Sequence, residues 1–406
     1  MNQARVIIEG LRSGIPYRET ADTMTVGRQD NLRSLASLME TVAAGRRPKT
    51  SGQIVRAQYG EGKTHLLHAM ASQAWDANWV VSMVSLSKES PLDRLDHLYP
   101  KIAQNLMRPG SRVAGLQPLV TEALQASLFL SESRTLSLSD RTRLVLDNLA
   151  RQDAGFEDLV GDLEGNFLTA VELKRIHREN FSKSIQLPAS RVKDEVPYYF
   201  LLVDWLIQRA GYQGWLILFD EVELMGKFGR GGRARSYGNL GRFLAGMGER
   251  TVSVWAVAGN FQKDVLIDRG DVERAPEWLM SRPQDVNSVA WARLALDELS
   301  SARPLEPPSV VAVKELIGQV FRLHQEAYGW TAEMDESAFW ERVRSQLPST
   351  DAKLRTWVRL SLALLDNALL YGADGGAVRA GALDEVDLSE DDADATGSVS
   401  RRRIFD

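Results

Sequence analysis

Two kinds of hydrophobic pattern alternate along the chain. Short runs that are almost wholly apolar predict buried strands, and runs with apolar residues three and four positions apart predict helices. The predicted strands are QIVRAQ (53–58), WVVSMVSL (79–86), GWLILFDEVELM (214–225), TVSVWAVAGNF (251–261) and a further short candidate near 286–292. Helical patterns lie between them, and strands that alternate with helices predict an α/β fold with a parallel sheet.

The same pattern indicates how the chain is divided. A long interval after the second strand is mostly helical, and the proline-rich segment PLEPPS (304–309) marks a domain boundary. The final segment is rich in Gly, Ala and acidic residues, and we expect it to be disordered. The expected parts are a core (1–303) with an N-terminal helix (1–25) and a helical insertion (about 87–196), a helical lid (304–371) and an acidic tail (372–406).

Composition narrows the class of protein. The chain has 406 residues, of which 44% are hydrophobic and 25% are charged, as in globular proteins. No apolar stretch reaches the roughly 18 residues of a membrane helix, so no membrane partner is expected. The absence of cysteine excludes disulfides and Cys-based zinc sites. Because the first residues lack the layout of a signal peptide, we expect a cytoplasmic protein.

Charge gives little sign of nucleic acid. The net charge is −5, and residues 384–406 account for it, since they hold eight acidic and three basic side chains. The remainder of the chain is formally neutral. Any contact with DNA would therefore come from a local basic patch.

A glycine-rich stretch, AQYGEGKTHLL (57–67), follows a predicted strand and opens a predicted helix. This is the context of a phosphate-binding P-loop, G-x-x-x-x-G-K-[ST], although Ala57 replaces its first glycine. Lys63 would reach the β- and γ-phosphates, and the Thr64 hydroxyl would bind Mg²⁺. The sequence thus predicts ATP and Mg²⁺ as cofactors. The loop residues expected to contact the nucleotide are Tyr59, Gly60, Glu61, Gly62, Lys63, Thr64 and His65.

Acidic and amide side chains follow two of the predicted strands. Functional groups of parallel sheets gather at the carboxyl ends of the strands. Asp220 would hold Mg²⁺ through water, and Glu221 would polarise the attacking water. Asn260 follows the next strand and could orient that water. A solvated strand end and a helix-capping Asn260 remain the alternatives.

In this order, these features resemble an AAA+ ATPase. GEGKT, LFDE and the strand that ends in Asn260 correspond to Walker A, Walker B and sensor 1. TVGRQDNL (25–32) resembles the box that precedes Walker A in the origin-recognition and STAND branches. That resemblance implies that three residues border the adenine, namely Val26, Gly27 and Arg28.

Two further segments resemble AAA+ motifs that carry an arginine. EWLMSRP (277–283) resembles the segment of the arginine finger, which implies a catalytic role for Arg282 on a neighbouring subunit. DAKLRTWVRLSLALLD (351–366) resembles the lid helix with the sensor-2 arginine, which implies Arg355. An ordinary surface position is the alternative for both arginines.

The closer resemblance is to the ATP-binding proteins of BREX phage-exclusion systems. It rests on ARVIIEGLRSGIP, VGRQDNL, YGEGKTHLLHAM, LFDEVELM and SYGNLGRFL, and it runs over roughly residues 4–368. The resemblance implies a P-loop AAA+ core with a helical insertion and a C-terminal helical lid. It also implies antiphage defence, self-association and partners such as a helicase.

The segment GKFGRGGRARSYGNLGR (226–242) holds several cations and no acid. It reads as a flexible loop that leads into a helix. Flexible glycines among arginines suit contacts with a phosphate backbone. The candidate nucleic-acid residues are Lys227, Arg230, Arg233 and Arg235. Contact with an acidic partner protein and a plain solvated loop are the alternatives.

Three functions fit these observations. The first is an ATP-hydrolysing AAA+ motor or switch that acts on DNA in a defence complex. The second is a nucleotide-gated scaffold that hydrolyses little ATP and recruits a helicase or nuclease. The third is a loader or regulator that forms filaments on DNA.

Overall fold

The structure is a computed structural model that describes residues 3–13, 21, 24–58, 60–126, 129–282, 287–347 and 353–372. The chain forms two compact units. We call residues 30–59 and 69–305 the sheet unit, and residues 1–29, 60–68 and 306–406 the helical unit. The expected tail from residue 373 onward and Tyr59 of the predicted P-loop lie outside the described residues.

A five-stranded, mostly parallel sheet forms the centre of the sheet unit. Its order is β1-β5-β4-β2-β3, and only β3 is antiparallel to its neighbour. Parallel strands are covered on both faces, which explains why four of the five are apolar runs. The strands are β1 (Gly52–Ala57), β2 (Val80–Ser85), β3 (Leu106–Met107), β4 (Trp215–Asp220) and β5 (Thr251–Ala258).

The four main predicted strands are confirmed, and the α/β class with them. The further strand predicted near 286–292 is wrong, because helix α14 (Ser288–Ser301) begins there. Its apolar residues face the core at helical spacing, and a short run cannot separate the two patterns. Beside β1 the chain instead makes a single parallel bridge, between Arg56 and Pro304.

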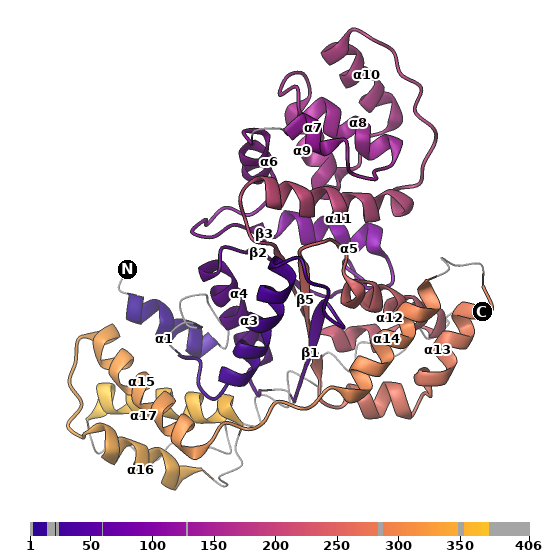
Figure 1. Cartoon of the computed structure of the whole chain (residues 1–406). Coiled ribbons are helices and arrows are strands. Elements are labelled where there is room, and N and C mark those ends of the chain that lie inside the picture. Colours follow the sequence, from indigo (N-terminus) through magenta and orange to yellow (C-terminus); the bar gives the residue numbers. More distant parts are fainter. Residues whose placement is uncertain are drawn as a thin grey trace, which may run out of the picture. The chain divides into compact units, whose positions relative to one another are not determined.

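Helix α12 (Arg230–Ala245) packs against β1 and β5 (Figure 1). Three aromatic rings make this contact specific. Phe219 of β4 and Trp255 of β5 stack with ring centroids 3.8 Å apart, and Phe243 of α12 meets both edge-on. Such ring contacts add to the stabilisation that comes from apolar burial, and they hold α12 over β4 and β5.

The interpretation of residues 226–238 as a flexible loop is wrong, since α12 begins at Arg230. Its glycines allow close packing instead of flexibility. A Cβ atom on Gly241 would lie 1.8 Å from the carbonyl oxygen of Trp291 in α14, so the two helices could not approach with a larger residue. Glycine disfavours an isolated helix, but here tertiary packing outweighs that cost.

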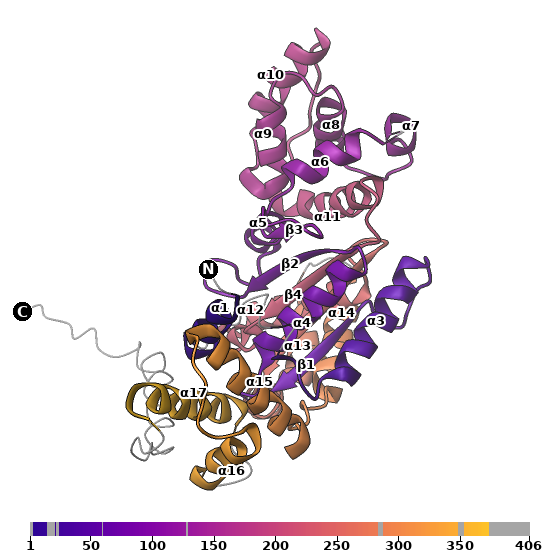
Figure 2. The ribbon, with the colours of Figure 1, turned by 90° about the vertical axis from the view of Figure 1, so that its left-hand side faces the viewer.

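Apart from the helices of the interval after β2, the other helices of the sheet unit surround the sheet (Figures 1 and 2). They are α3 (Gln29–Ala43), α4 (Lys63–Asp76), η2 (Val222–Lys227), η3 (Gln262–Ile267) and α13 (Asp271–Met280). Helix α4 begins in the glycine-rich loop and continues into the sheet unit. None of the described helices is long and apolar enough to cross a membrane.

The interval expected to be helical is confirmed as such, apart from the two residues of β3. Its helices lie together in the sheet unit, next to β2 and β3 (Figure 2). They are α5 (Leu95–Gln104), α6 (Gln117–Leu124), α7 (Phe129–Ser133), α8 (Asp140–Leu149), α9 (Phe156–Gly161), η1 (Asp162–Asn166), α10 (Ala170–Phe181) and α11 (Val192–Arg209).

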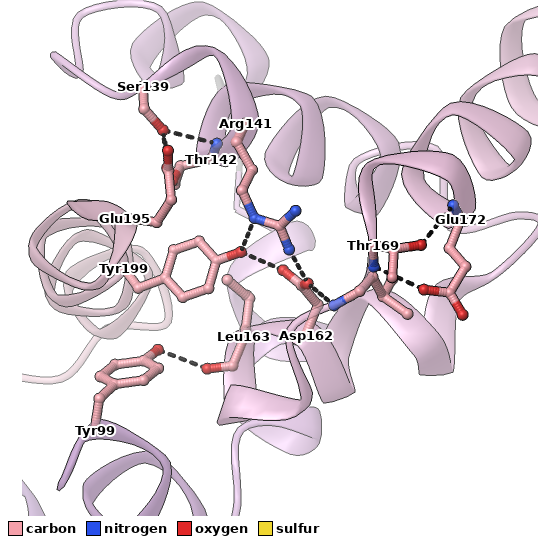
Figure 3. A network of polar contacts seen from close by, with 11 residues as sticks. Tyr99, Ser139, Arg141, Thr142, Asp162, Leu163, Thr169, Glu172, Glu195 and Tyr199 are labelled. Atoms are coloured by element: carbon pink, nitrogen blue, oxygen red, sulfur yellow. Dashed lines mark hydrogen bonds and ion pairs between the residues drawn. The ribbon is translucent and has the colours of Figure 1, made fainter. Parts of the chain in front are cut away.

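A buried polar network joins three of these helices (Figure 3). The Asp162 carboxylate accepts hydrogen bonds from Arg141 of α8 and Tyr199 of α11, and the Leu168 N–H donates to it at 2.6 Å. Burial raises the pKa of Asp162, although the Arg141 cation opposes this. Because each partner is hydrogen-bonded, the network fixes the relative positions of α8, η1 and α11.

The helical unit contains α1 (Gln3–Ser13), α15 (Val310–Tyr328), α16 (Glu336–Gln346) and α17 (Leu354–Tyr371). Helix α1 packs against α15 and α17, where Ile7 and Ile8 enter their apolar core (Figure 1). The sequence predicts that the N-terminal helix belongs to the core, whereas the structure gives it to the helical unit. The contact joins the two ends of the described chain, and no local pattern could reveal it.

Helix α11 is anchored to the start of β5 by the buried carboxylate of Asp204. It accepts hydrogen bonds from the Glu249 N–H (3.0 Å), the Arg250 N–H (3.2 Å) and the Thr251 hydroxyl (2.8 Å). Burial raises the pKa of Asp204 to about 6, although these donors lower it. One side chain therefore satisfies three polar groups at the turn before β5.

We expect Asp204→Ala to lower the free energy of unfolding by about 2–4 kcal/mol, because it leaves buried donors without an acceptor. Since the folded-state pKa lies above the ordinary value, the stability linked to Asp204 is lost as pH rises through about 6. The decrease in the free energy of unfolding caused by Asp204→Ala should thus be larger at about pH 4 than at about pH 8. Denaturant unfolding at the two pH values measures it. Gln208→Ala removes only one of the donors to this carboxylate and leaves the acceptor in place, so it serves as the control.

Candidate functional site

Three strands end at one edge of the sheet, because β1, β5 and β4 are parallel neighbours. The ends of β1 and β5 touch: the Gly259 N–H donates to the Ala57 carbonyl at 2.9 Å, and a Cβ on Gly259 would lie 2.5 Å from the Gln58 side chain. Asn260 follows directly. Its strand lies between β1, which leads into the glycine-rich loop, and β4, which ends in Asp220.

The acidic pair at the end of β4 has two distinct environments. Asp220 is buried, with 4% of its surface exposed, and its Oδ1 accepts the Glu221 N–H at 2.9 Å. Glu221 is exposed and has left-handed backbone angles, φ 57° and ψ 37°. This conformation costs a residue with a Cβ roughly 1–2 kcal/mol, and such outliers gather at functional sites. The chain turns sharply here and presents the Glu221 carboxylate to solvent.

A third acid, Glu223, was not among the residues expected from sequence. Its Oε2 accepts the Ala258 N–H at 3.0 Å. Strand β4 pairs with β5 only as far as Phe219 and Trp255, so this N–H needs another acceptor. The carboxylate extends the edge of the sheet in place of a strand carbonyl, and it links η2 to the end of β5.

Asn260 is exposed and lies in the turn that precedes the short helix η3. Its Nδ2 donates to Asp264 Oδ2 at 2.9 Å, and its carbonyl oxygen accepts the Asp264 N–H at 3.0 Å. These bonds join Asn260 to the first turn of η3 through its amide nitrogen and its backbone carbonyl. An exposed amide at this position is still able to turn toward a bound molecule.

The glycine-rich loop has the backbone expected of a phosphate cradle. Gly60 and Gly62 have φ values of 81° and 87°, which glycine alone adopts without strain. Helix α4 begins at Lys63, and the Leu66 N–H bonds the Gly62 carbonyl. The N–H groups of its first turn are the ones that bind anions in such loops. Lys63 and Thr64 stand in this turn, both partly exposed.

Arg28 holds the middle of this loop, and it is 5% exposed. Its guanidinium donates to the carbonyl of Glu61 at 3.0 Å and to the carbonyl of Glu306 at 2.6 Å. The burial of this side chain lowers its pKa. The arginine thus connects the box at residues 25–28, the loop and the start of the C-terminal helices, all within the helical unit.

A second bond joins the box to the first turn of α4. The Thr25 hydroxyl donates to the Ala21 carbonyl at 2.6 Å, and its oxygen lies 3.0 Å from His65 Nε2. The hydroxyl proton is already committed, so the imidazole donates. Burial, with help from His68 and Arg28, lowers the pKa of His65 to about 4, so the ring is neutral near pH 7. Val26, the next residue after Thr25, is buried, whereas Gly27 is exposed.

The start of α17 lies against the loop. The Arg355 N–H donates to the Gly60 carbonyl at 3.4 Å. A Cβ on Gly60 would lie 3.2 Å from Lys353 Cδ, and 3.8 Å from Arg355 Cβ. The structure therefore brings Arg355 to the loop, as the sensor-2 resemblance implies, and adds Lys353, which sequence analysis did not single out.

The basic residues of 226–242 are dispersed. Arg233 lies inside the fold, where it bonds both oxygens of Asp271 at 2.6 and 2.8 Å. Arg235 pairs with Asp93 at 2.7 Å. Lys227 and Arg230 are exposed. The four candidate nucleic-acid residues therefore do not share one environment. The ion pair with Asp271 explains the presence of Arg233 without any contact to nucleic acid.

Arg282 follows the end of α13 and is exposed. Its guanidinium carbon lies 5.3 Å from the centroid of the Trp278 ring, and that of Arg235 lies 5.7 Å from the same ring. A cation over an aromatic face is held by about 0.5–1 kcal/mol at exposed sites. The contact restricts Arg282 while leaving it open to solvent.

One family model matches this chain. Residues 1–127, which include the box and the glycine-rich loop, match the family described as BREX system ATP-binding protein BrxC/D. The resemblance to the ATP-binding proteins of BREX systems is thereby confirmed over this part of the chain. Searches of curated proteins and of solved structures found no match.

The backbone at Glu221 makes a stability prediction. Glu221→Gly should raise the free energy of unfolding by about 1 kcal/mol, because glycine adopts the left-handed angles without a Cβ clash. Glu221→Ala keeps the Cβ and should show no such gain. Denaturant unfolding of the two variants decides the matter, and a Glu221→Gly protein no more stable than Glu221→Ala would show that the position is unstrained.

Arg233 and Arg230 make a matched pair on α12. Arg233→Ala leaves the Asp271 carboxylate buried without its partner and should lower the free energy of unfolding by about 3–5 kcal/mol. Arg230→Ala changes an exposed side chain and should stay within about 0.5 kcal/mol. Thermal unfolding measures both. Equal, small effects would contradict the assignment of Arg233 to the interior.

Proposed function

We propose that this protein binds ATP with Mg²⁺ and hydrolyses it, as a motor or switch in an antiphage defence complex. The observation that carries the proposal is the loop between β1 and α4. Its two glycines have positive φ, and a lysine and a threonine begin the helix. The match of residues 1–127 to a family of BREX system ATP-binding proteins supports the same conclusion.

The proposed roles follow from the chemistry of each group. Lys63 neutralises charge on the β- and γ-phosphates, and Glu221 polarises the attacking water. The exposed carboxylate of Glu221, at the edge where β1 also ends, is accessible to a water molecule. Asn260, which follows the intervening strand β5, would exchange its bond to Asp264 for one to this water.

The residues present fit a magnesium ion that arrives with the nucleotide. Among the described residues, no group of three or more His, Asp or Glu side chains could hold a metal ion. Mg²⁺ in nucleotide sites keeps several waters and needs only one or two protein ligands beside the phosphates. Thr64 and Asp220 would supply them. One oxygen of Asp220 accepts the Glu221 N–H, which holds the carboxylate in place.

We infer a P-loop AAA+ ATPase with a C-terminal lid as the finer class. The strand that carries Asn260 is the neighbour of β1, as a sensor-1 role requires. Arg355 at the loop supports a lid function for the helices from α15 to α17. Arg282, exposed and steadied by Trp278, has the properties of an arginine finger. Such a finger acts on a neighbouring subunit, so the active form would be an oligomer.

DNA and defence proteins, such as a helicase, remain the proposed partners. Lys227 and Arg230 are the exposed cations that support a phosphate contact on α12 and η2. A nucleotide-gated scaffold is the second candidate. The bond that the Asn260 amide donates to Asp264 favours it, since it already engages the amide that would orient the attacking water.

ATP turnover of the full chain, with and without double-stranded DNA, tests the proposal. Lys63→Ala should abolish ATP binding, and Glu221→Gln should keep binding while lowering turnover by at least about 100-fold. Arg175→Ala, on the exposed side of α10, is the matched control and should change neither. Tight binding without turnover in the unaltered protein would support the scaffold, and no binding would refute both.

A further inference from the structure

Two consecutive peptide groups of the glycine-rich loop have their carbonyls occupied. The Gly60 carbonyl accepts the Arg355 N–H, and the Glu61 carbonyl accepts the Arg28 guanidinium. None of the described peptide bonds is cis. In a trans peptide, the C=O and the following N–H point in opposite directions. The N–H groups of Glu61 and Gly62 are therefore turned away from Arg355 and Arg28.

Backbone N–H groups turned away from the donors that hold their carbonyls are the groups from which such loops build an anion site. Successive backbone N–H groups that point to the same side form a concave anion site, and positive φ at the glycines permits it. Gly60 and Gly62 have such angles. A peptide that rotated would place a carbonyl oxygen toward the phosphates and repel them. Whatever holds the two carbonyls thus determines how well the loop binds phosphate.

Arg28 is poorly placed to contact a base. It is 5% exposed, and its two terminal nitrogens donate to backbone carbonyls on either side. A guanidinium has five N–H donors and no acceptor, so a base would have to compete for the remaining ones. The adenine-bordering role implied by the AAA+ resemblance does not match this geometry.

We propose that Arg28 is a positioning residue for phosphate: it holds the Glu61 carbonyl outward and so presents the Gly62 N–H to the bound phosphates. Its second bond, to Glu306, ties the loop to the chain that enters α15. The phosphate affinity of the loop is thereby linked to the C-terminal helices. The inference rests on the proposed function, since it concerns the same ATP site.

Tripolyphosphate separates a phosphate role from a base role, because it carries the phosphates without the adenosine. We expect Arg28→Gln to weaken binding of ATP and of tripolyphosphate by the same factor, at least about tenfold, the scale of loss when outer-shell partners of a bound ion are removed. Arg28→Lys keeps a cationic donor for one carbonyl and should restore part of both affinities. Calorimetric titration of the full chain measures them.

Val26→Ala is the matched control from the same box. Val26 has no polar group that could hold a loop carbonyl, so its truncation should leave tripolyphosphate binding unchanged. A loss of ATP affinity alone in this variant would reflect the adenine-bordering role that the AAA+ resemblance implies. Thermal unfolding without ligand checks that each variant is folded. If Arg28→Gln is unfolded, the two affinities of Arg28→Lys test the phosphate role of Arg28. If binding is partly restored in Arg28→Lys, a general loss of structure is excluded as the cause of the loss in Arg28→Gln.

The other outcomes overturn the inference in distinguishable ways. If Arg28→Gln weakens ATP alone, Arg28 contacts the base. If it weakens neither ligand, the loop holds its conformation without Arg28. Failure of the unaltered protein to bind ATP or tripolyphosphate would refute the proposed function itself, and the inference with it.

Discussion

The parallel pairing of β1, β5 and β4 is the constraint on which the rest of the structure depends. Because the strands run in one direction, the chain leaves all three at the same edge. The glycine-rich loop, the Asp220–Glu221 pair and Asn260 each follow one of these ends. The stacked rings of Phe219 and Trp255, with α12 over them, maintain that register. A shift in the register of one strand would change which residues end at this edge of the sheet.

Glycine has two different roles in this chain, and the sequence alone does not distinguish them. In the loop, Gly60 and Gly62 take positive φ, which is what a phosphate-binding pattern implies. In α12, Gly241 lies under the backbone of α14, where any Cβ would collide. The first role follows from a local motif. The second depends on a neighbour about fifty residues away, and so a helix was mistaken for a loop.

Polar side chains that are buried or half-buried connect the elements that carry the candidate site. Asp204 anchors β5 to α11, Glu223 completes the edge of β5, and Arg28 holds the loop. Each bonds backbone groups that secondary structure leaves unpaired, as buried N–H and C=O groups require. If the proposal is correct, nucleotide affinity reflects this supporting set as much as the residues of the P-loop motif.

The sequence by itself determined the four main strands, the helical interval after β2 and the glycine-rich loop, because hydrophobic period and glycine content are local properties. Only the tertiary structure decided the partners of Arg28, Arg233 and Glu223, and the place of α1 beside α15. These contacts join residues from 33 to about 300 positions apart. A buried charge is stable only with its partner, and which partner it meets depends on how the chain folds back on itself.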